Sequence, residues 1–251
     1  MAERLQVVLA RAGVASRRQA EKLIREGSVM VNGQVVRKPG TQVIWGQDAI
    51  RVGNRLICRL EPKVTIVMNK PKRVLTTSHD PEGRRTTAEL VRRIKARIFP
   101  VGRLDYDTEG LLILTNDGEL AQHLEHPRYG IPKTYRAKVK GMPTAEALQS
   151  LRSGVKLDGR RTAPPVVKKI GTTGKNTWLE ITIKEGRNRQ VRRMCWAVGH
   201  PVLKLKRTRY GPIRLGNLKP GFYRDLTPAE MQKLRKYIPN PGKPEKLKAQ
   251  G

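Results

Sequence analysis

The first residues of the chain carry the spacing of two short helices. Within residues 5–12, apolar side chains recur three and four positions apart, and Gly13 then interrupts the pattern. Ser16 and Gln19 are spaced as a capping box for a second helix, which Gly27 would end. The sequence therefore predicts a pair of helices at the start of the chain.

A β-hairpin is predicted next, over residues 29–36. Its centre is Asn32-Gly33, a pair that favours the two-residue turn in which both residues have a positive φ. Ile44, Ile50 and Val52 indicate further short strands. Two helices followed by a hairpin would form a small module.

The pattern changes after this module. Residues 58–63 show little periodicity and predict a linker. Residues 64–68 are apolar and predict a buried strand that ends at Asn69-Lys70-Pro71. A polar loop over residues 79–85 and a helix through residues 88–94 should follow.

The rest of the chain alternates between strand and helix patterns. Two helices are expected in this part of the chain. The second is strongly basic, and its apolar side chains should face the core. Basic and apolar residues alternate in the last expected strand. This mixture predicts an α+β protein. The expected elements are strands over residues 111–114, 133–139, 181–183 and 201–207, a helix after Asn116-Asp117-Gly118, and the basic helix with Val191, Met194, Cys195 and Val198 inward.

The charge of the chain indicates a polyanionic partner. The sequence has 52 Lys and Arg residues against 21 Asp and Glu residues, a formal net charge of +31. Such an excess favours nucleic acid or an anionic membrane surface. No apolar segment is long enough to span a bilayer, residues 1–4 lead into no signal-peptide core, and Cys58 and Cys195 lack metal-site spacing. We therefore expect a cytoplasmic, RNA-binding protein without a metal site.

The most informative motif spans residues 102–112. It places Asp105 between Arg103 and the apolar run 111–114. A carboxylate there can act as a nucleophile or base, and the arginine can meet a phosphate or fill a gap in a base stack. Alternatively, Asp105 merely caps a polar turn before a buried strand. The spacing alone leaves both interpretations open.

Several motifs together resemble one enzyme family. Gly-Arg-Leu-Asp at residues 102–105, followed by Thr-x-Gly-Leu-Leu at residues 108–112, resembles the active-site signature of pseudouridine synthases. Asn69-Lys70-Pro71 is similar to their first motif. Residues 12–18 and 31–33 resemble the RNA-binding module named after ribosomal protein S-four. Along almost its whole length, the chain resembles the RsuA/RluB-type ribosomal RNA pseudouridine synthases.

The resemblance implies a domain arrangement within the α+β class. A small helix-hairpin RNA-binding domain and its linker would occupy residues 1–62. A mixed, largely antiparallel β-sheet with flanking helices would form the pseudouridine synthase domain over residues 63–238. The basic, proline-containing residues 239–251 are expected to be a disordered tail.

The resemblance also implies roles for single residues. Asp105 would be the catalytic carboxylate, and Arg103 would fill the space that the flipped nucleotide leaves. Tyr135, in a Lys-x-Tyr motif, would lie against the target uracil, whereas an isolated strand tyrosine is otherwise a half-buried core residue. Arg192 would pair with Asp105 and keep its carboxylate charged. Leu205 would form part of the pocket floor.

Basic residues in two regions are expected to contact RNA. One group lies on or beside the first helices, and the other lies just before the strongly basic helix. A charge run on a helix is otherwise a solvated face. The residues are Arg11, Arg17, Arg18, Lys22, Arg187 and Arg189.

The implied activity is the isomerisation of a specific uridine in ribosomal RNA to pseudouridine, without cofactor, metal or energy donor. Residues 80–84 and the overall spacing are closer to the RluB branch than to the RsuA branch, which favours large-subunit (23S) rRNA. The alternatives are a small-subunit (16S) rRNA enzyme and a catalytically silent rRNA-binding or assembly protein. We expect a monomer that acts on rRNA, free or within a ribosome-assembly intermediate.

Overall fold

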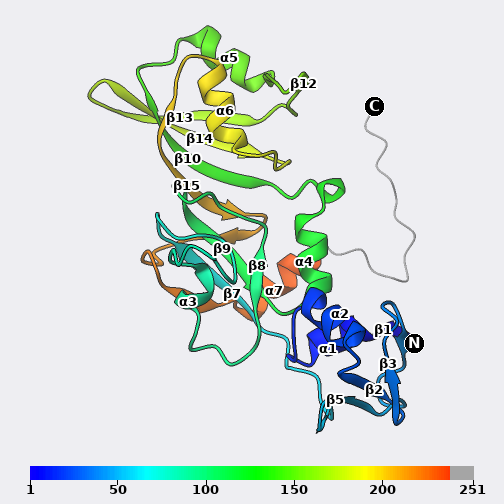
Figure 1. Cartoon of the computed structure of the whole chain (residues 1–251). Helices are drawn as coiled ribbons and strands as arrows, with labels where there is room; N and C mark the ends of the chain where they lie inside the picture. Colours follow the sequence, from blue (N-terminus) through cyan, green and yellow to red (C-terminus); the bar gives the residue numbers. More distant parts are fainter. Residues whose placement is uncertain (238–251) are drawn as a thin grey trace. The chain divides into compact units, whose positions relative to one another are not determined.

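The computed structural model describes residues 1–237, which divide into two compact units (Figure 1). The N-terminal unit contains Met1–Val64 and the segment Ile94–Arg97. The sheet unit contains Thr65–Arg93 and residues 98–237. The predicted α+β fold is confirmed, with a helix-hairpin unit and a mixed, mostly antiparallel sheet. The tail expected over residues 239–251 lies outside the described residues.

Two helices and six short strands form the N-terminal unit. The helices pack their apolar side chains against those of the strands in one core, in which Leu5, Leu9, Ile24 and Ile50 are fully buried. The order β3-β2-β5-β6 forms one sheet, and β1 pairs with β4. The elements are β1 (Glu3–Arg4), α1 (Leu5–Arg11), α2 (Arg17–Arg25), β2 (Val29–Val31), β3 (Gln34–Val36), β4 (Gln42–Val43), β5 (Ile50–Val52) and β6 (Arg55–Leu56).

Local signals explain the start of α2 and the turn of the β2–β3 hairpin. The side chain of Ser16 accepts a hydrogen bond from the Gln19 amide, and Gln19 completes the capping box. Asn32 has a φ of 52° and Gly33 a φ of 80°, as the two-residue turn requires. Both predictions are confirmed. The strand indicated by Ile44 ends one residue earlier, with β4.

The sheet unit contains the remaining elements. They are β7 (Thr65–Lys70), α3 (Thr87–Leu90), β8 (Phe99–Val101), β9 (Glu109–Thr115), α4 (Gly118–Glu125), the 3-10 helix η1 (Pro127–Tyr129), β10 (Lys133–Lys140), α5 (Ala145–Arg152), β11 (Lys156–Leu157), β12 (Arg160–Arg161), β13 (Val166–Thr173), β14 (Asn176–Ile183), α6 (Gln190–Ala197), β15 (Val202–Tyr210), β16 (Ile213–Arg214), β17 (Tyr223–Asp225) and α7 (Pro228–Arg235). None of the helices within residues 1–237 is long and apolar enough to cross a membrane.

One sheet carries this unit. Its main strand order is β13-β14-β10-β15-β9-β7-β17, with β8 beside β9 and β16 beside β15. Within residues 1–237, its strand pairs are antiparallel except for β15 and β9, which are parallel at the middle of the sheet. This pair places the end of the 102–112 motif directly beside β15.

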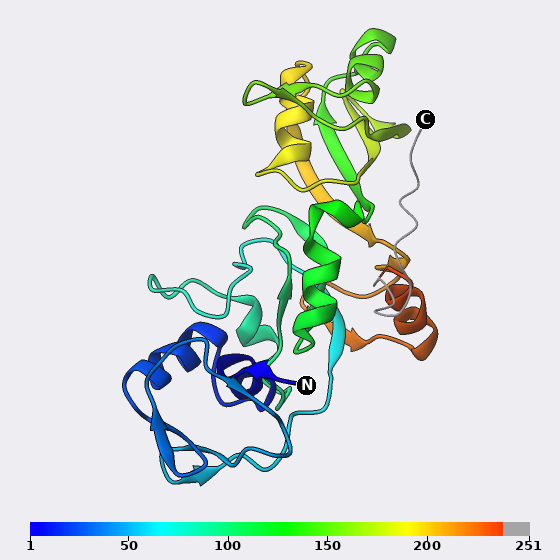
Figure 2. The same ribbon diagram turned by 90° about the vertical axis from the view of Figure 1, so that its right-hand side faces the viewer.

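Helices cover the two halves of the sheet separately (Figures 1 and 2). α4 and α7 lie by the half that contains β7 and β9, and Leu120, Leu124 and Leu234 share a core with Leu111 and Ile113. α5 and α6 lie by the half that contains β13, β14 and β10. On α6, Val191, Met194 and Cys195 are buried as predicted, whereas Val198 is the partly buried C-cap.

Gly110 permits the contact between β9 and β15. Its φ is +114°, and it lies opposite Arg207 in the parallel pair. A Cβ at residue 110 would overlap the carbonyl oxygen of Arg207 and lie 2.6 Å from its amide nitrogen. Only glycine combines this backbone conformation with so close an approach of two backbones.

The prediction of a helix through residues 88–94 is correct only for its first turn, because α3 ends at Leu90. Thr86 and Glu89 form a capping box at the start of α3, but Val91 has left the helical conformation with a φ of −111°. The chain then supplies Ile94–Arg97 to the N-terminal unit. Apolar periodicity continues through this region, but tertiary packing ends the helix.

Candidate active site

A cavity of about 450 Å³ lies in the sheet unit around the 102–105 motif. It is lined by Arg103 and Asp105 from the motif, Tyr135 from β10, Leu205 from β15, and Arg189 from the loop before α6. The structure thus brings together residues that the sequence predicted from four separate segments. Arg192 is not among the lining residues.

The backbone on both sides of Asp105 is held by hydrogen bonds. The amide of Thr108 donates to the carbonyl of Asp105 at 3.0 Å, closing a tight turn. The hydroxyl of Thr76 donates to the carbonyl of Leu104 at 2.7 Å and accepts from its amide at 3.2 Å. The Asp105 side chain is 32% exposed, so a fixed backbone presents an accessible carboxylate. Sequence reasoning missed Thr76, which stands in no motif.

Lys70 is a buried cation near this turn. Its ammonium group donates to the carbonyls of Val74 at 2.7 Å and Pro71 at 3.0 Å, and the residue is 0% exposed. Burial lowers the pKa of Lys70 to about 8, although the negative charges of Asp105 and Asp107 oppose the shift. Lys70 therefore anchors the segment after β7 and adds a positive charge near the motif.

The expected ion pair between Arg192 and Asp105 is wrong for this structure. The guanidinium of Arg189 lies 3.7 Å from the Asp105 carboxylate and 3.3 Å from that of Asp107. Arg192 instead lies 3.0 Å from the Asp107 carboxylate. Burial raises the pKa of Asp107, but the hydrogen bond from Arg189 and the charge of Arg192 outweigh it and lower that pKa.

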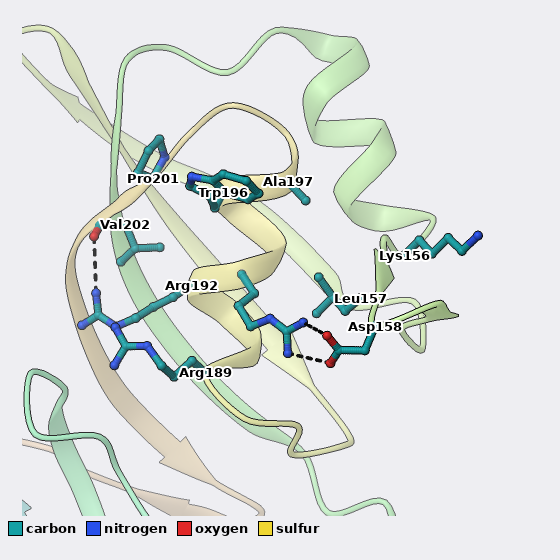
Figure 3. Close-up of a pocket in the computed structure, with 10 residues that line it drawn as sticks. Lys156, Leu157, Asp158, Arg189, Arg192, Trp196, Ala197, Pro201 and Val202 are labelled. Atoms are coloured by element: carbon teal, nitrogen blue, oxygen red, sulfur yellow. Dashed lines mark hydrogen bonds and ion pairs between the residues drawn. The ribbon is translucent and has the colours of Figure 1, made fainter.

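The hydrogen bonds of Arg192 explain this exchange of partners. Its Nη2 also donates to the Asp107 carbonyl at 3.1 Å and the Thr108 hydroxyl at 3.4 Å. Its Nη1 donates to the Val202 carbonyl at 3.3 Å, and Figure 3 shows this last contact. These acceptors hold the guanidinium against the turn that follows Asp105. Arg189 precedes the first helical residue and has a left-handed φ of 46°, so its side chain leaves in a different direction.

Tyr135 and Leu205 form an apolar wall of the cavity. They are 8% and 4% exposed and lie on the adjacent strands β10 and β15. Basic and apolar residues are expected to alternate between the two faces of β15. Two residues depart from this pattern, because the basic Arg207 is 2% exposed and the apolar Leu203 is 49% exposed. Residues two apart share a strand face, so the backbone places Arg207 inward beside Leu205 despite its charge. The Nε of Arg207 donates to the Leu111 carbonyl at 2.7 Å.

Lys133 is a further cation that lines the cavity. Burial, and then the charge of Arg207, lower the pKa of Lys133 to about 8, against the opposing charge of Glu125. Its ammonium lies 5.4 Å from the ring centroid of Tyr210. The sequence contained a signal for this position, because Lys133 and Tyr135 are two residues apart on a strand and therefore share a face.

Arg187, which is expected to contact RNA, lines the cavity and also has a structural role. Its Nε donates to Glu185 at 3.3 Å, and its two terminal nitrogens donate to the carbonyls of Arg160 at 3.0 Å and Arg161 at 2.7 Å. Each guanidinium nitrogen therefore has a partner within the protein. Arg187 ties the loop before α6 to β12, and its charge is offset by Glu185.

The N-terminal residues that are expected to contact RNA fall into two groups. Arg17, Arg18 and Lys22 lie on α2 with exposed side chains, and Lys22 lies 3.7 Å from the Glu26 carboxylate. Arg11 donates to the Glu3 carboxylate at 2.7 Å, so its charge is balanced inside the unit. Arg17 and Arg18 are therefore the more available to an RNA phosphate.

The chemistry of the cavity follows from these groups. The accessible carboxylate of Asp105 lies beside Arg189, while Lys133 and Arg207 supply further positive charge and Tyr135 an aromatic ring. Such a site can hold a planar base against the ring and place a carboxylate at its sugar. Within residues 1–237, no group of three or more His, Cys, Asp and Glu side chains is arranged to hold a metal ion.

Comparison with known proteins identifies the family. Residues 64–197 match the family described as RNA pseudouridylate synthase, and residues 3–44 match the S4 domain. The ribosomal large subunit pseudouridine synthase B of Bacillus subtilis is 50% identical over 235 residues, covering 93% of this chain and 96% of that protein. Its namesake from Pseudomonas aeruginosa is 41% identical over 243 residues, covering 94% of this chain and 62% of that protein.

A solved structure agrees with these relatives. A crystal structure described as a pseudouridylate synthase has a TM-score of 0.65 and 29% sequence identity, covering 92% of this chain and 99% of that chain. The resemblance inferred from the motifs is therefore confirmed, and the chain belongs to the RNA pseudouridylate synthase family.

Proposed function

We propose that this enzyme converts a uridine of large-subunit ribosomal RNA to pseudouridine and that Asp105 is its catalytic carboxylate. The observation that carries the proposal is the single cavity in which Asp105, Tyr135 and Leu205 meet beside Arg189. The rRNA substrate is supported by the names of the relatives from Bacillus subtilis and Pseudomonas aeruginosa. Such a substrate supports a cytoplasmic location for the enzyme.

The reaction makes modest chemical demands. The bond between N1 of uracil and C1′ of ribose breaks, the base turns, a bond forms between C5 and C1′, and the C5 proton is lost while N1 gains one. Atoms and electrons balance without an oxidant or an energy donor. The protein must supply a placed carboxylate, a pocket that retains the free base, and groups that orient it.

The cavity residues divide these tasks. Asp105 supplies the carboxylate, and Tyr135 and Leu205 hold the plane of the uracil. Stacking on an aromatic ring contributes roughly 1–3 kcal/mol per base. The target must leave its helix, at a cost of a few kcal/mol. Arg103, which is exposed within the motif, would occupy the vacated space in the stack.

The proposal is tested by mapping pseudouridines in the rRNA of a strain that lacks the gene. One 23S site is expected to revert to uridine and to be restored by the wild-type gene. The purified enzyme should be a monomer and should modify the same site in a 23S transcript. Comparing naked rRNA with assembly intermediates then identifies its substrate in the cell.

Two outcomes would support other functions. A missing pseudouridine in 16S rRNA would assign the enzyme to the small subunit. An unchanged pseudouridine map together with altered ribosome assembly would indicate a catalytically silent rRNA-binding protein. The second alternative accounts for the charge of the chain, but it gives no role to the arrangement of Asp105, Tyr135 and Arg189 around one cavity.

Replacing both Arg17 and Arg18 with alanine is expected to weaken rRNA binding and flatten its salt dependence. Each lost phosphate contact should reduce the slope of log affinity against log salt by roughly 0.7–0.9. The slope of the double variant should therefore fall by about 1.4–1.8, measured by filter binding over a salt series. Arg11→Ala is the control, because Glu3 already balances that charge. Equal slopes for all proteins would contradict an RNA-binding role for α2.

Replacing Arg192 with methionine is expected to lower the single-turnover rate by about 100-fold, since a shift of about 1 Å in a catalytic group has an effect of that order. The rate of Arg192→Lys should lie between those of wild type and Arg192→Met. Lysine keeps the charge near Asp107, but its single ammonium cannot reach all the acceptors that the Arg192 guanidinium contacts. Arg224→Met, which breaks the pair with Glu230, is the control. Near-wild-type rates for both Arg192 variants would show that the turn keeps its position without this contact.

A further inference from the structure

A second cavity of about 470 Å³ lies along α6 (Figure 3). Its walls are α6, the β11–β12 hairpin and the start of β15. Its volume falls within the range of roughly 300–1,000 Å³ that is typical of small-molecule sites. The cavity combines an exposed aromatic residue with several basic residues, and none of the roles proposed above uses this combination.

Trp196 forms the aromatic part of this cavity. It is 72% exposed, although the neighbouring Met194 and Cys195 on α6 are fully buried. An indole so far outside the core leaves a large apolar surface in water, which is unusual for tryptophan. Figure 3 shows Trp196 beside Pro201 at one end of the cavity. A flat apolar ring at the edge of a cavity can stack a planar ligand.

Four basic residues also line the cavity. Arg189, Arg192, Arg193 and Lys156 carry four positive charges, and Asp158, which pairs with Arg193, is the one acid among the lining residues. This balance favours an anionic ligand. An aromatic platform beside positive charge is the combination that binds an unpaired nucleotide, because the ring stacks the base and the cations meet the phosphate.

The hairpin wall is held in place by an ion pair. Asp158 and Gly159 form the tip of the β11–β12 hairpin and both have a positive φ. The Asp158 carboxylate accepts hydrogen bonds from both terminal nitrogens of Arg193, at 2.5 and 2.9 Å. The hairpin is therefore tied to α6, and this contact fixes one wall of the cavity between them.

The second cavity adjoins the candidate active site. Arg189 lines both cavities and contacts the carboxylates of Asp105 and Asp107. An RNA strand that places its uridine beside Asp105 therefore has basic surface leading past Arg189 to Trp196. The adjoining position suits a nucleotide close to the target in the same strand.

We propose that this second cavity binds an unpaired base of the substrate RNA that flanks the target uridine, with Trp196 stacking on the base and the basic residues holding its phosphate. The proposal rests on the proposed function for the identity of the RNA. Its physical basis, stacking and charge, can be tested with RNA that contains no uridine.

The first test measures the binding of labelled hexa-adenylate by fluorescence anisotropy. Trp196→Ala is expected to weaken binding about tenfold, since loss of one stacked base has an effect of that order, and Trp196→Phe should retain most of the affinity. Phe222→Ala is the matched control, because Phe222 is 62% exposed and does not line the cavity. Binding by Trp196→Ala within twofold of wild type would overturn the proposal.

The second test locates the base. An rRNA fragment is made with one abasic nucleotide at each position near the target uridine. In wild-type protein, one flanking abasic position should weaken binding, and the same position should have no further effect in Trp196→Ala. Equal losses in both proteins at every position would overturn the proposal.

These tests separate the two hypotheses. Trp196→Ala should still form pseudouridine at saturating RNA, because Trp196 lies outside the first cavity. If wild-type protein forms no pseudouridine, the proposed function fails, and the hexa-adenylate measurement still decides whether Trp196 binds RNA. If wild-type protein is active and both Trp196 variants bind RNA like Phe222→Ala, the proposed function stands and the second cavity is not an RNA site.

Discussion

Replacing Asp105 with asparagine is expected to slow pseudouridine formation by at least about a thousandfold, as loss of a nucleophile or base does in other enzymes. The amide has nearly the same shape but cannot supply a charged oxygen. Folding should be little affected, because the Asp105 side chain is 32% exposed and its ion pair with Arg189 is long, at 3.7 Å. The measurements are single-turnover product formation and thermal unfolding.

Asp107→Asn is the matched control. Asp107 lies two residues away and pairs with Arg189 and Arg192, at 3.3 and 3.0 Å. Its loss should loosen the turn and slow the reaction, but by far less than the loss of Asp105. The assignment fails if Asp105→Asn retains appreciable activity, or if Asp107→Asn proves the more damaging of the two variants.

Replacing Gly110 with alanine is expected to destabilise the sheet unit by roughly 3–5 kcal/mol. Part of this arises because a φ of +114° is unfavourable for a residue with a side chain. The larger part arises because the new Cβ would overlap the backbone of Arg207. A backbone atom cannot rotate away as a side chain does, so β9 and β15 must separate. Urea unfolding measures the loss.

Gly216→Ala tests the backbone conformation alone. Gly216 also has a positive φ, of 57°, but a Cβ there meets no atom within 4 Å. Its cost should stay near 1–2 kcal/mol. Equal destabilisation by the two variants would mean that the close contact between β9 and β15 contributes little. Because Gly110 follows the turn that carries Asp105, Gly110→Ala should also reduce activity under conditions in which it remains folded.

The sequence by itself determined the elements whose signals are local. Ser16 and Gln19 cap α2 because their side chains reach backbone amides only three residues away. Asn32-Gly33 specifies the hairpin because few residues adopt positive φ at low cost. The 102–112 motif also indicated the family and the position of Asp105, because its residues act together within one short turn.

Tertiary structure alone decided which charges meet. The contact of Arg192 with the Asp107 carbonyl joins residues 85 positions apart. Whether Arg189 or Arg192 reaches Asp105 depends on the left-handed backbone at Arg189 and on acceptors supplied by Thr108 and Val202. Coulomb energy depends on distances of a few ångströms, and spacing along the chain does not set distances across a fold.

Burial of charge was likewise decided by the sheet. Arg207 lies inward because it shares a strand face with Leu205, whereas the sequence pattern indicated only that basic and apolar residues alternate along this strand. The one-turn length of α3 has a similar origin, since its apolar periodicity continues but residues 94–97 join the N-terminal unit. Periodicity reports what a segment prefers in isolation, whereas the final exposure of each side chain depends on what packs against it.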